Sequence, residues 1–210
     1  MVVWLKDNLK TGNSCTVLAG YKKQSHSVYS KSLFMKIIPV LLVLFLFSCK
    51  KEVTELPPAT QTGANNFGCR IDETIWGPQK NPVFPGAAIL EARQQPDKDL
   101  YINARNFVSS PNETEFEIFI KNMNATGTYN FNTTMSASNE GANYVYYVKR
   151  NITPQNEWMT SASYTGTVTI TTYDTVQRFV SGTFQMQMIN LYNDPQPITV
   201  TEGRFDVKIQ

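Results

Sequence analysis

The strongest constraint on the fold is a two-residue alternation of apolar and polar side chains. It is clear in residues 100–105, 116–121 and 167–171. Successive side chains of a strand point to opposite faces, so this period is typical of half-buried β-strands. Turn-forming residues separate such segments at intervals of roughly ten to fifteen residues, and no segment shows a helical period. The sequence predicts an all-β fold, an antiparallel meander forming a β-sandwich, with a flattened lipocalin-like barrel as the alternative.

A second feature, in residues 35–49, predicts where in the cell the protein is located. Residues 37–47 form an apolar run behind Lys36, and the run is shorter than the ~20 residues that cross a bilayer. It matches the apolar region of an export signal. The run closes on residues 46–49, Leu-Phe-Ser-Cys, which resemble the lipobox of bacterial lipoproteins. That resemblance implies cleavage before Cys49 and lipidation of its sulfur. A transmembrane anchor or a buried helix is the alternative.

These segments divide the chain into four parts. Residues 1–34 precede the signal and are interpreted as a mis-annotated extension upstream of a true start at Met35, or alternatively as a genuine extended signal region. Residues 35–48 are the signal peptide. Residues 49–65, which include Pro57-Pro58 and little apolar content, predict a flexible tether. Residues 66–210 are expected to form a single β domain.

The net charge of the chain limits the classes of molecule that it is expected to bind. The full chain has formal net charge +2, and residues 1–48 carry six Lys and one Asp, so residues 49–210 carry a net charge of −3. A slightly acidic chain does not favour nucleic acid as a partner. The expected partners are the membrane, through the lipid anchor, and a glycan or an envelope protein. The expected location is the outer membrane, facing the periplasm or the cell exterior.

Histidine and cysteine limit the chemistry. The only histidine is His26, in the part expected to be removed. Without it, a Ser-His-Asp triad, a Cys-His pair and a His-bearing zinc site are all excluded. Cys69 has no cysteine partner once Cys15 is removed and Cys49 is lipidated, so it is expected to be a small buried residue. The sequence predicts no enzyme, no cofactor and no metal site.

A family resemblance covers most of residues 66–210. The segments 164–170, 180–184 and 198–207 look like the closing strands of a family of small lipoproteins of unknown function from Gram-negative bacteria. Residues 67–76, with Asp72-Glu73 in the turn, are similar to that family's opening hairpin. The resemblance implies an all-β fold. It supplies no catalytic residues.

Aromatic side chains are the candidate ligand contacts. Flat rings on a β-scaffold stack on sugar rings, and the candidates are Tyr101, Tyr129, Tyr144, Tyr147 and Trp158. The alternative is that these rings pack in the core. The predicted function is a non-enzymatic binding or structural accessory of the cell envelope, with a glycan as the preferred ligand. A lipocalin-like carrier of a small apolar ligand is the alternative.

Carboxylates are the second group of candidates. Glu113, Glu115 and Glu117 occupy alternate positions and share a face of a predicted strand. Such a row suits a general acid/base pair or Ca²⁺, although it is more often the solvated face of an edge strand. Asp97 and Asp99 are a weaker Ca²⁺ candidate, and neither set has EF-hand spacing.

Overall fold

The computed structural model describes residues 53–81, 86, 88–109, 112–134, 141–150, 156–192 and 196–210, and every regular element within them is a β-strand. The strands are β1 (Asn66–Ile71), β2 (Thr74–Trp76), β3 (Leu90–Gln94), β4 (Leu100–Asn106), β5 (Thr114–Ile120), β6 (Gly127–Phe131), β7 (Tyr144–Lys149), β8 (Asn156–Met159), β9 (Gly166–Asp174), β10 (Phe179–Asn190) and β11 (Ile198–Lys208). These strands pair with antiparallel neighbours. The prediction of an all-β antiparallel fold is confirmed.

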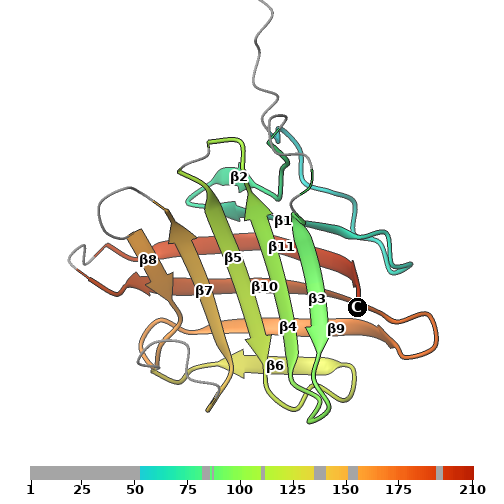
Figure 1. The fold of residues 1–210 in the computed structure, drawn as a ribbon. Coiled ribbons are helices and arrows are strands. Elements are labelled where there is room, and N and C mark those ends of the chain that lie inside the picture. The colour runs from blue at the N-terminus through green and yellow to red at the C-terminus, as the bar shows by residue number, and fades with distance from the viewer. Residues whose placement is uncertain are drawn as a thin grey trace, which may run out of the picture. The chain divides into compact units, whose positions relative to one another are not determined.

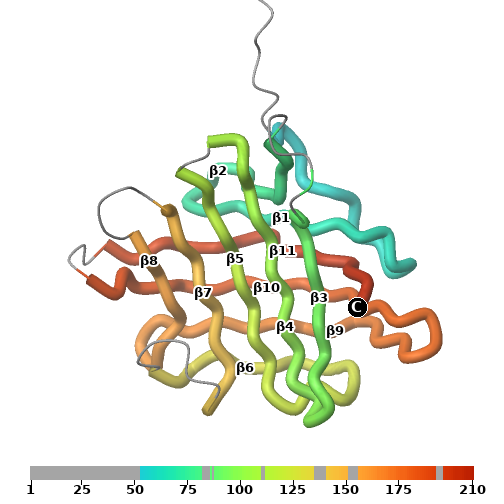
Figure 2. The backbone as a smooth tube through the Cα atoms, viewed as in Figure 1, coloured from blue at the N-terminus to red at the C-terminus, as the bar shows by residue number. Residues whose placement is uncertain are grey.

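The strands form two layers that run crosswise to each other (Figure 1). The first layer has the order β3-β4-β5-β7-β8, and the second has β2-β1-β11-β10-β9-β6. Strand β10 joins the layers, because most of it pairs with β9 and β11 while Ile189 and Asn190 pair with β8. At another corner, where the C-terminus lies beside β3 (Figure 2), Gln210 N donates to Ala92 O at 2.9 Å. The sheet therefore curls over itself, as in a sandwich closed toward a barrel.

Side chains from both layers fill the space between them. Inward-facing residues such as Phe116, Ile118 and Val207 are fully buried. A row of aromatic rings crosses the interior, with neighbouring centroids 5.2–6.2 Å apart. Its members are Phe67, Trp76, Phe116, Tyr147, Trp158, Phe184 and Phe205. Cys69 is also fully buried, as predicted, and burial raises the pKa of its thiol.

The opening hairpin is confirmed, and its turn has an uncommon sequence. Asp72 and Glu73 join β1 to β2 with φ values of 46° and 68°. Two positive φ angles are the mark of a type I′ turn, which matches the twist of the flanking strands and usually contains Asn-Gly. Thr199 N, on β11, donates to Asp72 Oδ1 at 2.8 Å. This contact to the neighbouring strand helps hold a conformation that Asp adopts at some cost.

The segment before β1 differs from the predicted flexible tether. Asp206 of β11 is fully buried, and its carboxylate accepts hydrogen bonds from the backbone N–H groups of Thr62, Gly63 and Ala64 at 2.8–3.0 Å. Thr60 Oγ1 donates to the same carboxylate at 2.7 Å. Residues 60–64 are therefore bound to the sheet, because a buried carboxylate requires donors and this segment supplies most of them.

Candidate functional site

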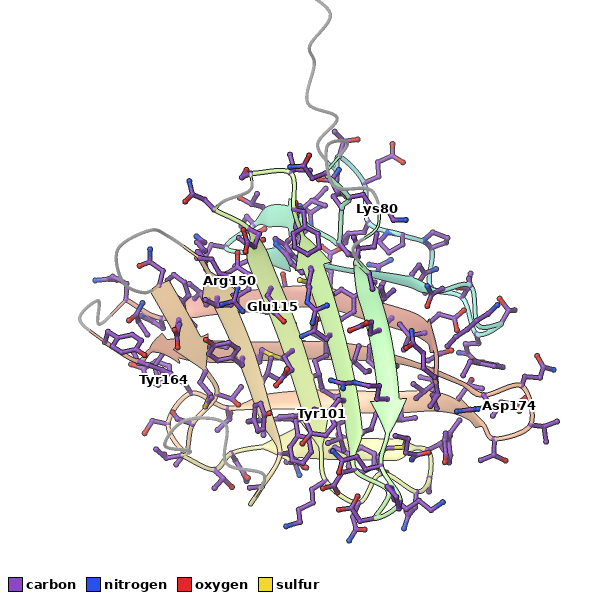
Figure 3. The ribbon with its side chains drawn as sticks, viewed as in Figure 1. Lys80, Tyr101, Glu115, Arg150, Tyr164 and Asp174 are labelled. Carbon is purple, nitrogen blue, oxygen red and sulfur yellow. The ribbon has the colours of Figure 1, made fainter. Side chains whose placement is uncertain are left out.

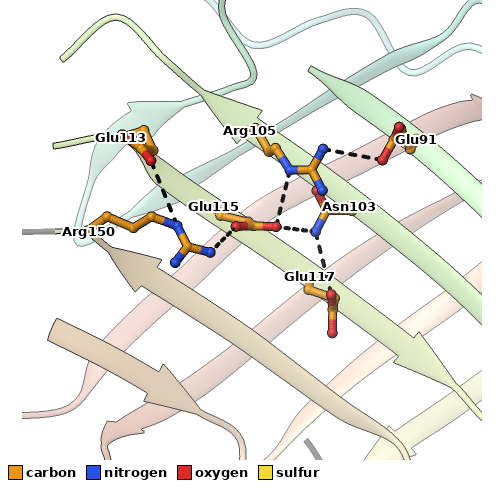
Figure 4. Close-up of polar contacts among 7 residues, drawn as sticks. All are labelled: Glu91, Asn103, Arg105, Glu113, Glu115, Glu117 and Arg150. Atoms are coloured by element: carbon orange, nitrogen blue, oxygen red, sulfur yellow. Dashed lines mark hydrogen bonds and ion pairs between the residues drawn. The ribbon is translucent and has the colours of Figure 1, made fainter. Parts of the chain in front are cut away.

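The outer face of the first layer carries a connected group of charged side chains, here called the outer-face network (Figure 4). Its members are Glu91, Asn103, Arg105, Glu113, Glu115, Glu117 and Arg150. Strand β5 lies between β4 and β7, so Glu115 and Glu117 are central in the layer. The shared face predicted for these glutamates is present. The alternative of a solvated edge strand is wrong, because β5 has neighbours on both sides.

Glu115 is the most heavily bonded member of the network. Arg150 Nη2 and Asn103 Nδ2 each lie 2.6 Å from its carboxylate oxygens, and Arg105 Nε lies 3.2 Å away. Its side chain is 14% exposed. Burial opposes ionisation of Glu115, but the hydrogen bonds from Arg150, Asn103 and Arg105 outweigh burial and lower its pKa. Glu115 is therefore a fixed anion whose role is to hold two arginines.

Aromatic rings lie beside this network on the same face. Phe119 packs between Tyr101 and Tyr144, with ring centroids 4.6 and 5.1 Å away; its ring is tilted against Tyr101 and stacked on Tyr144. The Tyr144 hydroxyl donates to Glu117 Oε1 at 2.7 Å. Phe119 is fully buried even though it belongs to a cluster separate from the main core. Figure 3 shows Glu115 and Arg150 near one end of this face and Tyr101 nearer the other.

A pocket of about 300 Å³ opens where the network meets the aromatic cluster. Its lining residues are Glu115, Glu117, Tyr144, Tyr146, Arg150, Glu157, Met159, Leu191 and Tyr192. Burial and a hydrogen bond with Glu157 raise the pKa of Tyr146, so its hydroxyl stays protonated. Tyr192 OH also donates to Glu157, at 3.4 Å. The pocket thus combines tyrosine rings, hydroxyl groups and carboxylates, which suits a polar ligand with an apolar face.

The predicted aromatic residues do not form one site. Tyr144 lines the pocket and Tyr101 extends the same cluster. Tyr129 lies on β6 in the second layer, where its hydroxyl donates to Ala125 O at 2.8 Å. Tyr147 and Trp158 are 3% and 6% exposed and belong to the core. These last two rings take the alternative role of core packing.

Several pocket residues were missed by the sequence analysis. Tyr146 is two residues from Tyr144 and therefore shares its face of β7, whereas Tyr147 faces the opposite side. The run of residues 144–148 has no polar residue to fix its phase. The contact of Glu157 and Tyr192 depends on β8 lying beside β10, which the sequence does not signal.

Other depressions in the surface have linings with fewer aromatic and acidic side chains. One of about 460 Å³ lies over β9, β10 and β11, and threonines contribute strongly to its lining. Another of about 550 Å³ lies beside β2 and contains Arg70 and Glu73 but no aromatic side chain. Only the pocket on the first layer, among these three, combines several tyrosines with several carboxylates. It is the candidate binding site.

The described residues contain neither a cluster of metal ligands nor a membrane-spanning helix. Across the described residues, no group of three or more His, Cys, Asp or Glu side chains is placed to hold a metal ion. Asp99 Oδ1 accepts from Asn122 N at 2.8 Å and Asp97 Oδ1 from Asp99 N at 3.3 Å, so both act within turns. Among those residues there is also no helix long and apolar enough to cross a membrane. The predicted lipidation site, Cys49, lies outside them.

Comparison with known proteins identifies the family. Searches of curated proteins and of solved structures give no match. The model of a domain of unknown function, DUF6252, matches residues 78–207, which is more than half of the chain. The match runs from just after β2 into the last strand, so it includes the residues of β5, β7 and β8 and those just after β10 that line the pocket. The chain therefore belongs to the DUF6252 family of uncharacterised domains.

Proposed function

We propose that the protein is a lipid-anchored binding module of the bacterial cell envelope and that its pocket binds a glycan. The observation that carries the proposal is the pocket of about 300 Å³ on the first layer. This volume lies at the lower end of the range for ligand sites, which suits a single sugar ring. The rings of Tyr144, Tyr146 and Tyr192 supply apolar surface, and the carboxylates of Glu117 and Glu157 accept hydrogen bonds from ligand hydroxyls.

The environment of Glu115 favours binding over catalysis at this carboxylate. A general acid in a glycoside hydrolase needs a raised pKa. Glu115 lines the pocket, and hydrogen bonds from Arg150, Asn103 and Arg105 outweigh its burial and lower its pKa. Glu115 is in addition held by two arginines. A carboxylate in that state is suited to fixing the shape of a site and not to donating a proton.

The packed interior does not favour the carrier alternative. A lipocalin-like carrier needs a cavity between its layers. In this chain that space contains the aromatic row, with ring centroids in contact range and Phe116 fully buried at its centre. A ligand on the outside of the sheet therefore fits the fold better than a ligand inside it.

Glycan binding is tested with the full-length protein, purified in detergent, on an array of immobilised glycans. We expect signal for a subset of glycans and loss of that signal in Tyr146→Ala, which removes a pocket ring. Tyr129→Ala is the matched control, because Tyr129 lies on β6 in the other layer. An array without signal, or equal loss in both variants, would overturn glycan binding at this pocket.

The anchor is supported by the apolar run and by the Leu-Phe-Ser-Cys sequence that ends at Cys49. Lipid chains on one sulfur and one amine hold a protein on a bilayer, because each buried methylene contributes ~0.8 kcal/mol. We expect the wild-type chain in the outer-membrane fraction and Cys49→Ser in the soluble fraction or retained as an uncleaved precursor in the inner membrane. Mass spectrometry should find a mature N-terminus at Cys49 with added lipid. Equal outer-membrane retention of the Cys49→Ser variant would contradict the anchor.

A further inference from the structure

We propose that the pocket on the first layer selects ligands that carry a protonated amine, so that an amino sugar binds and its neutral or N-acetylated counterpart binds much more weakly. The inference rests on the proposed function and specifies the ligand class of the same site. It follows from a difference among the pocket carboxylates. Some of them already have a cationic partner within the chain, whereas others have only neutral partners.

Glu115 has its positive charge supplied from within the chain. Arg150 Nη2 lies 2.6 Å from Glu115 Oε2, and Arg105 Nε lies 3.2 Å from Glu115 Oε1. Arg150 is also 4.0 Å from Glu113, and Arg105 is 3.3 Å from Glu91. The two guanidinium groups are thus committed to carboxylates of the outer-face network. Arg150 lines the pocket, but its charge is offset by Glu113 and Glu115.

Glu117 and Glu157 have a different environment. The hydrogen-bond donors to Glu117 are the hydroxyl of Tyr144 at 2.7 Å and the amide of Asn103 at 3.5 Å. Glu157 bonds with the hydroxyls of Tyr146 and Tyr192. Neither glutamate takes part in an ion pair with another described residue. The pocket lining therefore contains two carboxylates whose described partners are all neutral.

The strand register brings these two carboxylates to the same ring. Tyr146 of β7 lies opposite Glu117 of β5 on one side and opposite Met159 of β8 on the other. Glu157 is two residues from Met159 and therefore shares its face. An ammonium group placed over Tyr146 would be attracted by the face of the ring and by a carboxylate from each neighbouring strand.

Neutral and acidic ligands lack this electrostatic attraction to the two carboxylates and the ring. A hydroxyl can donate to Glu117 or Glu157, but a hydrogen bond between two ions is stronger than one from a neutral donor. N-acetylation removes the charge and leaves one N–H donor. A carboxylated ligand would be repelled, because the lining contains three glutamates and one arginine.

The test is isotope-edited NMR titration of the full-length protein in detergent with four probes: glucosamine, glucose, N-acetylglucosamine and lysine methyl ester. We expect chemical-shift changes of the Tyr146 and Glu157 amides with glucosamine. The affinities for glucose and N-acetylglucosamine should be weaker by at least about tenfold. Glu117→Gln and Glu157→Gln should each weaken glucosamine binding about fivefold to tenfold while changing glucose binding little. Glu55→Gln, an exposed glutamate in the segment before β1, is the control and should behave as wild type.

The outcomes separate this inference from the proposed function. If the three sugars bind equally well, the glycan site stands and the charge selectivity is overturned. If lysine methyl ester binds at the pocket and none of the sugars does, the selectivity for amines stands and the proposal that the pocket binds a glycan is overturned. If no probe shifts the pocket resonances, or if the two Gln variants bind glucosamine as wild type does, the inference is overturned.

Discussion

At the scale of single residues, the two carboxylates with shifted pKa values do different work. Glu115 lies on the outer face and organises the arginines beside the pocket. Asp206 lies under residues 60–64 and holds them on β11. Both are stabilised as anions by hydrogen-bond donors that no short sequence motif predicts. Sequence reasoning could place Asp206 in a strand, but four of its hydrogen-bond donors come from a segment more than 140 residues away.

Asp206 predicts a specific dependence of stability on pH. Burial would raise the pKa of its carboxyl, but hydrogen bonds from Ala64 N, Thr62 N, Ser181 Oγ and Thr60 Oγ1 outweigh burial and lower it to about 2. Because the folded-state pKa is lower than the unfolded-state value of 3.8, the ionised group stabilises the fold fully above pH 5. This contribution, about 2 kcal/mol, is lost as the pH falls through 4 toward 2.

Asp206→Asn should lower the free energy of unfolding at pH 7 by about 2 kcal/mol and flatten its decline between pH 5 and pH 2. Urea unfolding at a series of pH values measures both effects. Asp97→Asn, at an exposed turn, is the control and should keep the wild-type slope. An Asp206→Asn variant with an unchanged slope would show that this carboxyl does not titrate abnormally.

Gly203 predicts a packing effect. A Cβ at this position would contact the ring of Phe184, which is part of the aromatic row. Gly203→Ala should therefore cost about 1–3 kcal/mol, because the ring must shift within a filled core. Gly86→Ala is the matched control, since a Cβ there meets open space. Thermal unfolding should separate the two variants, and equal melting temperatures would contradict the close contact.

At the scale of elements, the alternation of side chains was enough to predict the layers. Phe184, Met186 and Met188 occupy alternate positions in the sequence, as residues on one face of a strand do, and all three are buried on β10. The alternation in residues 198–209 was also visible, but its phase changes at Glu202, which has φ 51°. There the pairing of β10 with β11 shifts register, as at a β-bulge, and β11 continues through the shift as one strand.

The site was harder to predict than the layers. The pocket depends on residues from β5, β7, β8 and the start of the loop after β10, and their proximity is a property of strand order. A local pattern fixes which side chains share a face of one strand. It does not fix which strands are neighbours, and it cannot choose between two faces when residues 144–148 are all apolar or aromatic. The pattern therefore does not distinguish Tyr147, which lies in the core, from Tyr144 and Tyr146, which line the pocket.

Strand β5 predicts that its outer face is structurally as important as its inner face. Ile118, Phe119 and Ile120 are all fully buried, although Phe119 faces away from the main core. Phe119→Ala should lower the free energy of unfolding by about 3–5 kcal/mol, as a core substitution does, because it opens a cavity between Tyr101 and Tyr144. Tyr192→Ala, at a 52% exposed rim residue, should cost far less. Chemical denaturation measures both, and a Phe119→Ala cost below 1 kcal/mol would contradict the burial.

At the scale of the whole molecule, the bound segment before β1 changes what a lipid at Cys49 would do. A flexible tether over residues 49–65 would let the domain move tens of ångströms from the bilayer. Residues 60–64 are bound to Asp206, Pro57 O accepts a hydrogen bond from Arg204 Nη1, and the Val53 side chain lies beside Gly77, so less chain is free to extend. Four residue steps separate Cys49 from Val53, and a fully extended chain spans about 14 Å over that length. The proposed anchor therefore keeps this end of the domain near the membrane surface.

This restraint predicts a short distance between Thr54 and the bilayer. A fluorophore on Thr54→Cys lies at most about 18 Å of extended chain from the anchor, and the buried Cys69 thiol should not compete for the label. In vesicles containing head-group nitroxide lipids, we expect strong quenching of the lipidated protein. The same label on a Cys49→Ser chain that lacks residues 1–48, and therefore both the apolar run and the lipid, should be quenched little. Inserting about twenty Gly and Ser residues after Glu52 should weaken the quenching, because a flexible linker of that length adds an r.m.s. distance of about 25 Å. Quenching that is unchanged by the insertion would mean that the domain is held at the membrane by its own surface and not by the length of chain behind Cys49.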